Sequence, residues 1–396
     1  MEVLVRLNDT LRYYSQLFDI PLLLIEKSNP QIASNQLKSG DSIQIPGYVL
    51  NKYTVNRNDT LREIAVQHNL SLDCLQLINQ LTNTNDLKKD QTIYLPKRVN
   101  DFIISDIDHY TYDKMQNDLK QLQQLYPFIF TQTIGYSVMG KKLVEVQIGS
   151  GDKKTHLNGS FHANEWITTS VIMKFVNEYA LSLTNNKQVK GISTLPLFQD
   201  TTLSLVPMVN PDGVNLVLKG SSESGKYKKE VLAMNKQSEN FSNWKANIRG
   251  VDLNKQYPAN WGMEAKRKPA SPAPRDFPGI KPLTEPEAIT MANLAKERNF
   301  ARINAFHTQG EEIYWGFKGF EPSISKRIAG EYARVSGYKP IGELDNYAGY
   351  KDWFVKKFQK PGFTIELGKG VNPLPIKQFS AIYERNVGIM LANLYL

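Results

Sequence analysis

The sequence predicts an α/β protein: an α/β/α sandwich around a mixed, largely parallel sheet, preceded by two small βααβ modules. Two observations carry this prediction. From about residue 105 onward, apolar strand-like runs alternate with helix-like runs, and this alternation is typical of a sheet covered by helices on both faces. The first hundred residues contain an internal repeat, which indicates duplicated modules.

The repeat extends over residues 1–97 without a gap. The stretch VRLNDTLRYYSQLFDI begins at Val5, and VNRNDTLREIAVQHNL begins at Val55. In each copy a short β run leads to an aspartate that suits a helix N-cap, Asp9 or Asp59. Two apolar-periodic helices and a short strand ending in proline follow. We therefore predict βααβ modules over residues 1–47 and 51–97.

These modules resemble the LysM family. The resemblance depends on NDTL in both copies, on the helix-ending Asn29 and Asn79, and on the patterns L..G..I.IP (37–46) and L..D..I.LP (87–96). It implies that the modules bind N-acetylglucosamine-containing glycan such as peptidoglycan. The alternative is a packing or dimerisation module. Three tyrosines suit sugar stacking and core packing equally well: Tyr13, Tyr14 and Tyr53.

The large domain is predicted to extend over residues 105–396. Helix patterns occupy 112–127, 164–183 and 284–298, and the last begins with Thr284 and Glu287 at the spacing of a capping box. Apolar strand patterns occupy five further segments: 142–149, 154–162, 201–213 with its terminal Asn-Pro-Asp-Gly turn, 301–308 and 361–368.

Residue types that bind metals lie where three of these strands are predicted to end: His162, His307 and Glu366. In sheets of this class the functional residues gather at the carboxyl ends of strands. Catalytic zinc takes three protein ligands and leaves one position to water. His162, Glu165 and His307 would supply these three ligands, and Glu366 would remain as a general base. A structural histidine is the alternative for each imidazole.

The large domain resembles the zinc carboxypeptidase family, with its carboxypeptidase A-like fold. The resemblance implies one Zn²⁺ per chain, bound by His162, Glu165 and His307, with Glu366 as general base and Asn254 contacting substrate. The motifs that carry it occur in the family's order: HANEW (162–166), PMVNPDGV (207–214), GVDLNKQY (250–257), FHTQGEEIYW (306–315), and DWF with FTIELG (352–354 and 363–368).

Three positions depart from the family pattern. Lys255 stands where the family has the arginine that binds the substrate carboxylate, and a lysine keeps the charge but lacks the bidentate fork. Either Arg249 or Lys245 could be the cation that stabilises the oxyanion. The catalytic tyrosine has no ungapped counterpart, because that position is Leu344, and Tyr347 is the candidate.

LysM repeats joined to such a domain resemble bacterial γ-D-glutamyl-meso-diaminopimelate peptidases. The resemblance implies a zinc metallopeptidase that hydrolyses peptidoglycan stem peptides at the γ-D-glutamyl–meso-diaminopimelate bond while the LysM modules bind glycan. Three alternatives remain open: a metallocarboxypeptidase that removes C-terminal L-amino acids, an amidoacylase of the same fold, and a non-catalytic wall-binding protein.

Composition limits the partners and the location. The chain has 396 residues, 41% of them hydrophobic, with a net charge of +9 and the single cysteine Cys74. No nucleic-acid motif accompanies the basic excess, and we expect neither a signal peptide nor a membrane span. We therefore expect a cytoplasmic protein, which a sporulating cell would use or which lysis would release to the cell wall.

Overall fold

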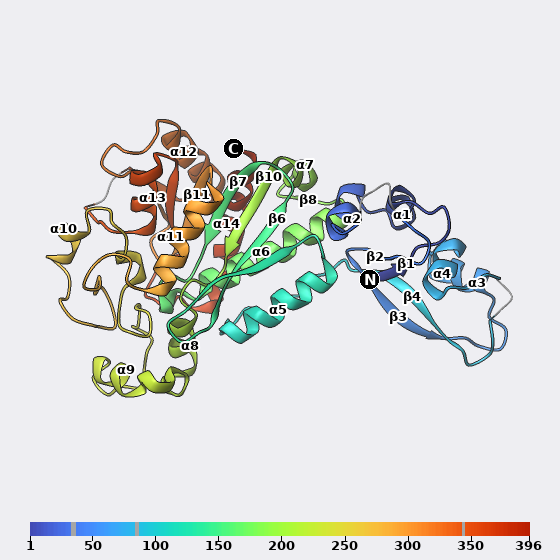
Figure 1. Cartoon of the computed structure of the whole chain (residues 1–396), viewed down its shortest axis with the longest axis horizontal. Helices are drawn as coiled ribbons and strands as arrows, with labels where there is room; N and C mark the ends of the chain where they lie inside the picture. The colour runs from blue at the N-terminus through green and yellow to red at the C-terminus, as the bar shows by residue number, and fades with distance from the viewer. Residues whose placement is uncertain (33–36, 84–86, 343–344) are drawn as a thin grey trace. The chain divides into compact units, whose positions relative to one another are not determined.

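The computed structural model describes residues 1–32, 37–83, 87–342 and 345–396. These residues divide into two units (Figure 1). Unit 1 contains residues 1–103, 119–130 and 177–195, and unit 2 contains residues 104–118, 131–176 and 196–396. Among the described helices, none combines the length and the apolar character that a membrane crossing requires.

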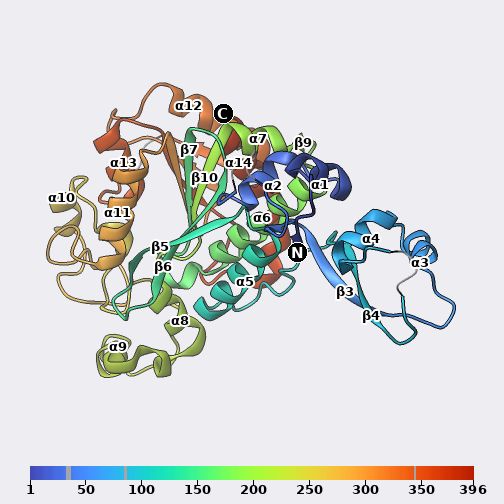
Figure 2. The ribbon, with the colours of Figure 1, turned by 45° about the vertical axis from the view of Figure 1, so that its right-hand side comes forward.

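Both N-terminal modules have the predicted βααβ order, and Figure 2 labels the two strands and two helices of the second module. In each module the two strands pair antiparallel. Module 1 consists of β1 (Glu2–Leu4), α1 (Leu11–Phe18), α2 (Leu22–Ser28) and β2 (Ser42–Gln44). Module 2 consists of β3 (Tyr48–Thr54), α3 (Leu61–Gln67), α4 (Leu72–Asn79) and β4 (Thr92–Arg98).

The predicted N-caps of the modules are wrong by one residue. Thr10 and Thr60 cap α1 and α3, and each side chain accepts a backbone N–H from the first turn. Asp59 instead accepts a hydrogen bond from the Tyr53 hydroxyl at 2.8 Å. The carboxylate therefore closes the loop before the helix, which leaves the neighbouring threonine as the cap.

The three tyrosines singled out in the modules differ in their surroundings. Tyr14 is fully buried and donates a hydrogen bond to Asp9 at 2.6 Å, so it packs in the core. Tyr13 and Tyr53 are partly exposed. Sugar stacking is therefore open to Tyr13 and Tyr53 alone among the three.

The described part of unit 2 is built on an eight-stranded sheet, whose predicted mixed, largely parallel character is confirmed. β7 pairs parallel with β10 and β11, β11 with β14, and β12 with β13, whereas β10–β6 and β12–β14 are antiparallel. The strand order is β13 (Lys339–Ile341), β12 (Glu312–Tyr314), β14 (Gly362–Glu366), β11 (Arg302–His307), β7 (Lys153–Asn158), β10 (Thr201–Val206), β6 (Lys142–Gly149) and β5 (Phe130–Tyr136).

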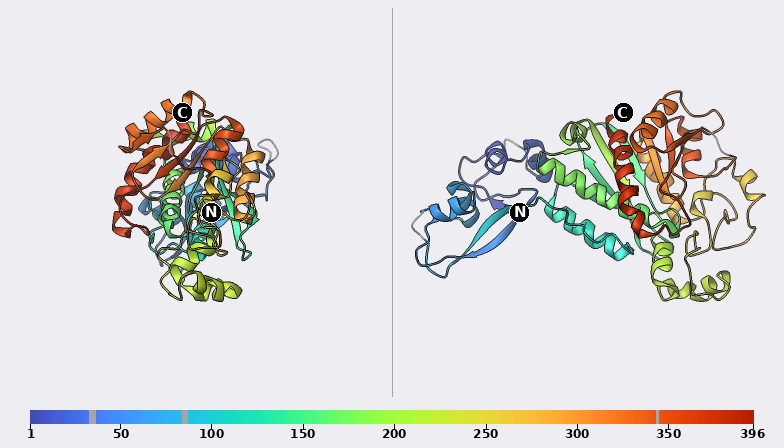
Figure 3. Two further views of the ribbon diagram at one scale, coloured as in Figure 1. Left: turned by 90° about the vertical axis from the view of Figure 1, so that its left-hand side faces the viewer. Right: turned by 180° about the vertical axis from the view of Figure 1, so that it is seen from behind.

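Helices cover both faces of this sheet (Figure 3). On one face, Ile303 and Ala305 of β11 share a buried cluster with α11 (Pro286–Arg298) and α13 (Tyr350–Phe358). On the other face, Asn304 of β11 donates to the Tyr332 hydroxyl of α12 (Ile324–Ser336), which packs against α14 (Phe379–Tyr395). Alternate residues of one strand therefore contact opposite helical layers.

The remaining elements include the long, largely buried helix α6 and several shorter helices and strands. The helices are α5 (Tyr112–Leu125), α6 (Ile167–Thr184), α7 (Thr194–Asp200), α8 (Pro211–Lys219), α9 (Lys228–Met234) and α10 (Trp261–Ala265). Two short strands, β8 (Gln188–Val189) and β9 (Ile192–Ser193), pair antiparallel. The 3₁₀ helices are η1 (Ala163–Glu165), η2 (Ser221–Tyr227), η3 (Leu253–Lys255) and η4 (Ile376–Gln378).

The predicted capping box at Thr284 and Glu287 is wrong. Glu285 occupies the N-cap of α11 and makes no side-chain capping bond. The Thr284 hydroxyl donates to Gln256 at 2.9 Å, and Glu287 is buried and accepts a hydrogen bond from the backbone of Val138 at 3.0 Å. Both side chains that would have formed the capping box instead make hydrogen bonds to residues distant in the sequence.

Candidate metal and catalytic centre

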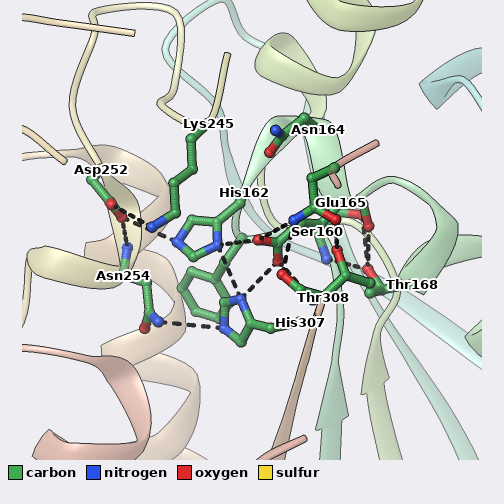
Figure 4. Close-up of polar contacts among 12 residues, drawn as sticks. Ser160, His162, Asn164, Glu165, Thr168, Lys245, Asp252, Asn254, His307 and Thr308 are labelled. Carbon is green, nitrogen blue, oxygen red and sulfur yellow. Dashed lines mark hydrogen bonds and ion pairs between the residues drawn. The ribbon is translucent and has the colours of Figure 1, made fainter. Parts of the chain in front are cut away.

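Three side chains converge at the carboxyl edge of the sheet (Figure 4). His307 is the last residue of β11, and His162 and Glu165 follow the neighbouring parallel strand β7. His162 Nδ1 lies 2.8 Å from Glu165 Oε1, and His307 Nδ1 lies 2.9 Å from Glu165 Oε2. The two Nδ1 atoms are 3.1 Å apart, and all three side chains are buried. The structure thus brings the three predicted ligands together.

His162 does not end a strand, contrary to the prediction. β7 ends at Asn158, and a loop carries the chain to His162. Gly159 lets this loop approach α6 closely, because a Cβ at that position would lie 2.9 Å from Thr168 Oγ1. Glu165 belongs to the 3₁₀ helix η1 and precedes α6, which begins at Ile167.

The donor set fits a zinc ion. Two imidazole nitrogens and a carboxylate face one another at short range, and these are preferred zinc ligands. Their far sides are also held: His162 Nε2 lies 3.2 Å from Asp252 Oδ1, and His307 Nε2 lies 3.4 Å from Asn254 Nδ2. A carboxylate that accepts the second ring N–H of a ligating histidine fixes the orientation of the ring, and Asp252 is placed to do so for His162. A cation bound between the two Nδ1 atoms and the Glu165 carboxylate would be attracted by lone pairs that otherwise repel one another.

Glu165 is held as a carboxylate. Its Oε2 accepts the backbone N–H of Thr308 at 3.2 Å, and its Oε1 accepts from Asn372 Nδ2 at 3.4 Å. Burial acts to raise the pKa of this carboxyl. The interactions with His162 and His307 outweigh burial, so the pKa lies below its ordinary value. The negative charge needed to bind a cation is therefore present without one.

Lys245 reaches this centre and Arg249 does not. Lys245 Nζ forms ion pairs with Asp252 at 3.1 Å and Asp276 at 3.5 Å, and it lines the cavity described next. Burial acts to lower the pKa of Lys245, yet these two carboxylates raise the pKa above its usual value. Arg249 is half exposed, lies 3.6 Å from Glu285 and is absent from the lining. Of the two predicted cations, Lys245 alone faces the site.

A cavity of about 460 Å³ opens beside the cluster. His162, Glu165 and Glu366 line it. Glu366 is the last residue of β14 and is in register with His307 on β11, so strand pairing fixes its place beside the ligands. Burial raises the pKa of Glu366 to about 7, with a further contribution from Glu165. A carboxyl with a pKa near neutrality suits proton transfer in both directions.

The two residues predicted to bind substrate line the same cavity, and the side chains of both already have partners. Asn254 Oδ1 accepts the backbone N–H of Tyr350 at 2.9 Å, and Asn254 Nδ2 lies 3.4 Å from His307 Nε2. The Lys255 ammonium lies 2.6 Å from Glu264, donates to the carbonyl oxygen of Tyr347 at 3.2 Å, and also donates to Asn346. These acceptors occupy its three N–H groups. Burial lowers the pKa of Lys255. The side chain is therefore fixed in a buried ion pair.

The structure places Tyr347 away from the cavity lining. The Tyr347 ring is buried, and the Arg267 guanidinium lies over it, 5.0 Å from the ring centre. Leu344, the residue at the position of the family's tyrosine, lies outside the described residues. Tyr314, which sequence reasoning missed, does line the cavity from the end of β12. Burial and a hydrogen bond to Glu312 raise the pKa of this phenol, so it stays neutral. A three-residue strand has too little periodicity to reveal such an orientation.

Comparison with known proteins identifies the families to which the two parts of the chain are similar. A family model described as zinc carboxypeptidase matches residues 115–387, and a LysM domain model matches residues 53–96. The chain belongs to the zinc carboxypeptidase family. It is a metallopeptidase of a zinc-binding family, and His162, Glu165 and His307 lie close enough together to hold a metal ion.

Two relatives are similar to this chain over most of its length. The chain is 50% identical, over the whole length of both proteins, to "Gamma-D-glutamyl-L-diamino acid endopeptidase 1" of Lysinibacillus sphaericus. It is 50% identical over 285 residues, 71% of this chain and 76% of the relative, to "Uncharacterized protein YqgT" of Bacillus subtilis (strain 168).

The solved structures share the fold at low identity. Bovine thrombin-activatable fibrinolysis inhibitor, in complex with tick carboxypeptidase inhibitor, superposes with a TM-score of 0.57 at 17% identity over 73% of this chain and 96% of its own. Carboxypeptidase A from Helicoverpa armigera gives a TM-score of 0.53 at 17% identity over 88% and 97%. These likenesses show the fold alone.

Proposed function

We propose that this metallopeptidase hydrolyses the γ-D-glutamyl–meso-diaminopimelate bond of peptidoglycan stem peptides and that one Zn²⁺ per chain is bound by His162, Glu165 and His307. The observation that carries the proposal is the 50% identity, over the whole of both chains, to a relative named as a γ-D-glutamyl-L-diamino acid endopeptidase. The match includes the N-terminal modules, which we propose bind the glycan strands that bear these peptides.

Each catalytic role follows from a position in the site. Zinc, when bound, polarises a carbonyl group and lowers the pKa of water. Glu366, at the end of β14 and facing the cavity, accepts the proton of the attacking water and returns it to the departing amine. Lys245 provides a fixed positive charge at the cavity wall, where negative charge develops on the carbonyl oxygen.

The alternative of a carboxypeptidase for C-terminal L-amino acids has weaker support. That activity requires a cation free to bind the terminal carboxylate, and Lys255 stands at the position of the family arginine. Its ammonium is already paired with Glu264 at 2.6 Å and bonded to two further oxygen acceptors. Breaking a buried ion pair to bind substrate would cost several kcal/mol.

The LysM modules would act by tethering. A glycan-bound module keeps the attached catalytic unit near stem peptides on the same strand, so the local substrate concentration rises without any new contact at the active site. The proposal therefore predicts faster cleavage of polymeric than of soluble substrate, and equal rates on soluble tripeptide with or without modules.

A side-by-side assay tests the proposed function. The substrates are L-Ala-γ-D-Glu-meso-diaminopimelate and a plain peptide with a C-terminal leucine or arginine. We expect cleavage of the first, a 10²- to 10⁴-fold loss in Glu366→Gln, and loss of zinc and activity in His162→Ala. Glu297→Gln, on the exposed side of α11, is the matched control. Preference for the plain peptide would overturn the proposed bond.

A further inference from the structure

An arginine at the start of β11 is buried, and none of the described residues pairs with it. Arg302 is 4% exposed, and its Nη1 atom is fully buried. No described residue forms a hydrogen bond or an ion pair with its guanidinium. Arg298, at the end of α11 on the other face of the sheet, shows the usual arrangement, because it pairs with Glu145 at 2.9 Å. A guanidinium does not lose its proton inside a protein, so the charge of Arg302 remains.

Strand pairing and α14 place further hydrogen-bond donors on the same side of the sheet. Thr155 of β7 is the register partner of Arg302, so both side chains point to the same face. Thr155 is fully buried, and its hydroxyl is unpartnered among the described residues. Asn393 of α14 also has a buried, unpartnered amide nitrogen, while its Oδ1 lies 3.4 Å from the Tyr332 hydroxyl. That hydroxyl accepts a hydrogen bond from Asn304, two residues after Arg302 on β11.

A second cation lies at the edge of this group. Lys153 is two residues before Thr155 on β7, and its ammonium donates to the carbonyl oxygen of Leu394 at 2.6 Å. Burial lowers the pKa of Lys153, and Arg302 lowers it further, whereas Asp200 acts in the opposite direction. Lys153 is partly exposed, so water stabilises its charge. Arg302 is therefore the cation whose charge is buried and unbalanced.

The neutral side chains around Arg302 cannot balance this charge. Asn304 Oδ1 is an unpartnered acceptor, but an amide oxygen carries no net charge. Burying an unpaired charge costs far more than burying a neutral polar group, and buried charges in proteins are therefore paired. Glu331, next to Tyr332 on α12, is already paired with Arg334 at 2.6 Å. A bound anion would supply the missing negative charge.

We propose that Arg302, Thr155 and Asn393 form a buried site for a small monovalent anion such as chloride. The guanidinium of Arg302 is the charged ligand, and the Thr155 hydroxyl and the Asn393 amide are neutral donors. The ion is small because all three residues are less than 5% exposed, and Lys153 attracts it from solvent at the rim. None of these residues lines the catalytic cavity, and the site does not depend on the proposed function. Five residues of β11 separate Arg302 from His307, a distance of roughly 17 Å.

Thermal melting of the full-length zinc-loaded protein tests the site. Sodium chloride is exchanged for sodium gluconate at constant ionic strength, because gluconate is too large to enter. An anion that binds the folded chain alone stabilises it in proportion to the logarithm of its concentration above Kd. We expect the melting temperature to rise by about 2–4 °C for each tenfold increase in chloride, and bromide should act in the same way.

Arg302→Met removes the charge and keeps a long side chain. We expect this variant to fold, because apolar replacement of a buried charge is often tolerated, and to melt at the same temperature in chloride and gluconate. Arg327→Met, at an exposed position on α12, is the matched control and should keep the full dependence on chloride. Chloride bound to zinc would affect both variants alike, so the comparison isolates the site at Arg302.

Crystals of the wild-type protein soaked in bromide provide a second readout that needs no variant. We expect an anomalous peak within hydrogen-bonding distance of Arg302 Nη1. Equal melting of the wild type in the two salts, a chloride effect that persists in Arg302→Met, or a water molecule at Arg302 with no anomalous peak would each overturn the proposal. A bromide peak there with melting that is independent of chloride indicates an adventitious ion only, and would overturn it as well.

Discussion

Replacing Asp252 by asparagine removes a charge on which two parts of the site depend. Its Oδ1 lies 3.2 Å from His162 Nε2, its Oδ2 lies 3.1 Å from Lys245 Nζ, and its side chain is fully buried. Burial acts to raise the pKa of this carboxyl, but Lys245 and His162 hold the pKa well below its ordinary value. Asp252→Asn keeps the shape and deletes the charge.

Two magnitudes follow from these contacts. Loss of the residue behind a ligating histidine weakens metal affinity by about 10- to 100-fold, which is roughly 1.4–2.8 kcal/mol. Removing one partner of a buried ion pair costs about 3–5 kcal/mol of folding stability. We expect a loss near the lower limit, because Lys245 keeps Asp276 at 3.5 Å and 17% of its side chain is exposed.

Competition between the enzyme and a chromophoric chelator measures the zinc affinity, and urea unfolding of the apoprotein measures the stability separately. Asp276→Asn is the matched control, because Asp276 also pairs with Lys245 but is not among the contacts of His162. It should leave the zinc affinity unchanged. If Asp252→Asn bound zinc within twofold of wild type, Asp252 would not orient the ligand and the reasoning would be wrong.

Three further predictions concern groups around the site. Burial raises the pKa of Glu287 from 4.5 to about 8, so between these pH values the unfolded chain releases a proton that the folded chain retains, and stability falls as pH rises. Glu287→Gln should therefore melt progressively higher than wild type from pH 5 to pH 8, with an upper limit of ~5 kcal/mol; a constant difference would contradict the assignment. Tyr314→Phe should lower kcat on the tripeptide about tenfold, because it removes a hydroxyl at the cavity wall. Tyr347→Phe should change kcat less than twofold. Steady-state kinetics that ranked the two variants in the reverse order would refute the placement of these rings. Thr60→Ala should destabilise unit 1 by about 1 kcal/mol through loss of the α3 cap. Thermal melting of the whole protein measures this loss, with Arg62→Ala, an exposed position on the same helix, as control.

The sequence predicted those parts of the site that local pattern controls. His307 and Glu366 each follow an apolar run that ends at the residue itself, so the strand ends could be located from periodicity. His162 could not be placed as well. The loop after Asn158 depends on the close approach of Gly159 to Thr168 on α6, which is a tertiary contact that no local alternation reveals.

The roles of the cations depended on contacts between distant segments. Lys245 faces the site because Asp252 and Asp276 hold it there. Lys255 is withdrawn by Glu264, a residue on α10 that carries no sequence signal of its own. Charge type and spacing in the sequence identify candidate cations. The ion pair that each cation makes in the folded chain then determines which of them faces the site.

The most direct test of the central claim is mass spectrometry of soluble muropeptides digested by the enzyme before chelation, after chelation, and after zinc is restored. The account predicts that a sugar-linked product ending in L-Ala-D-Glu and a diaminopimelate-containing product appear together, disappear with the chelator, and return with zinc. Release of the C-terminal residue from a tetrapeptide stem with the γ-D-glutamyl bond intact, or cleavage that survives complete removal of metal, would contradict it.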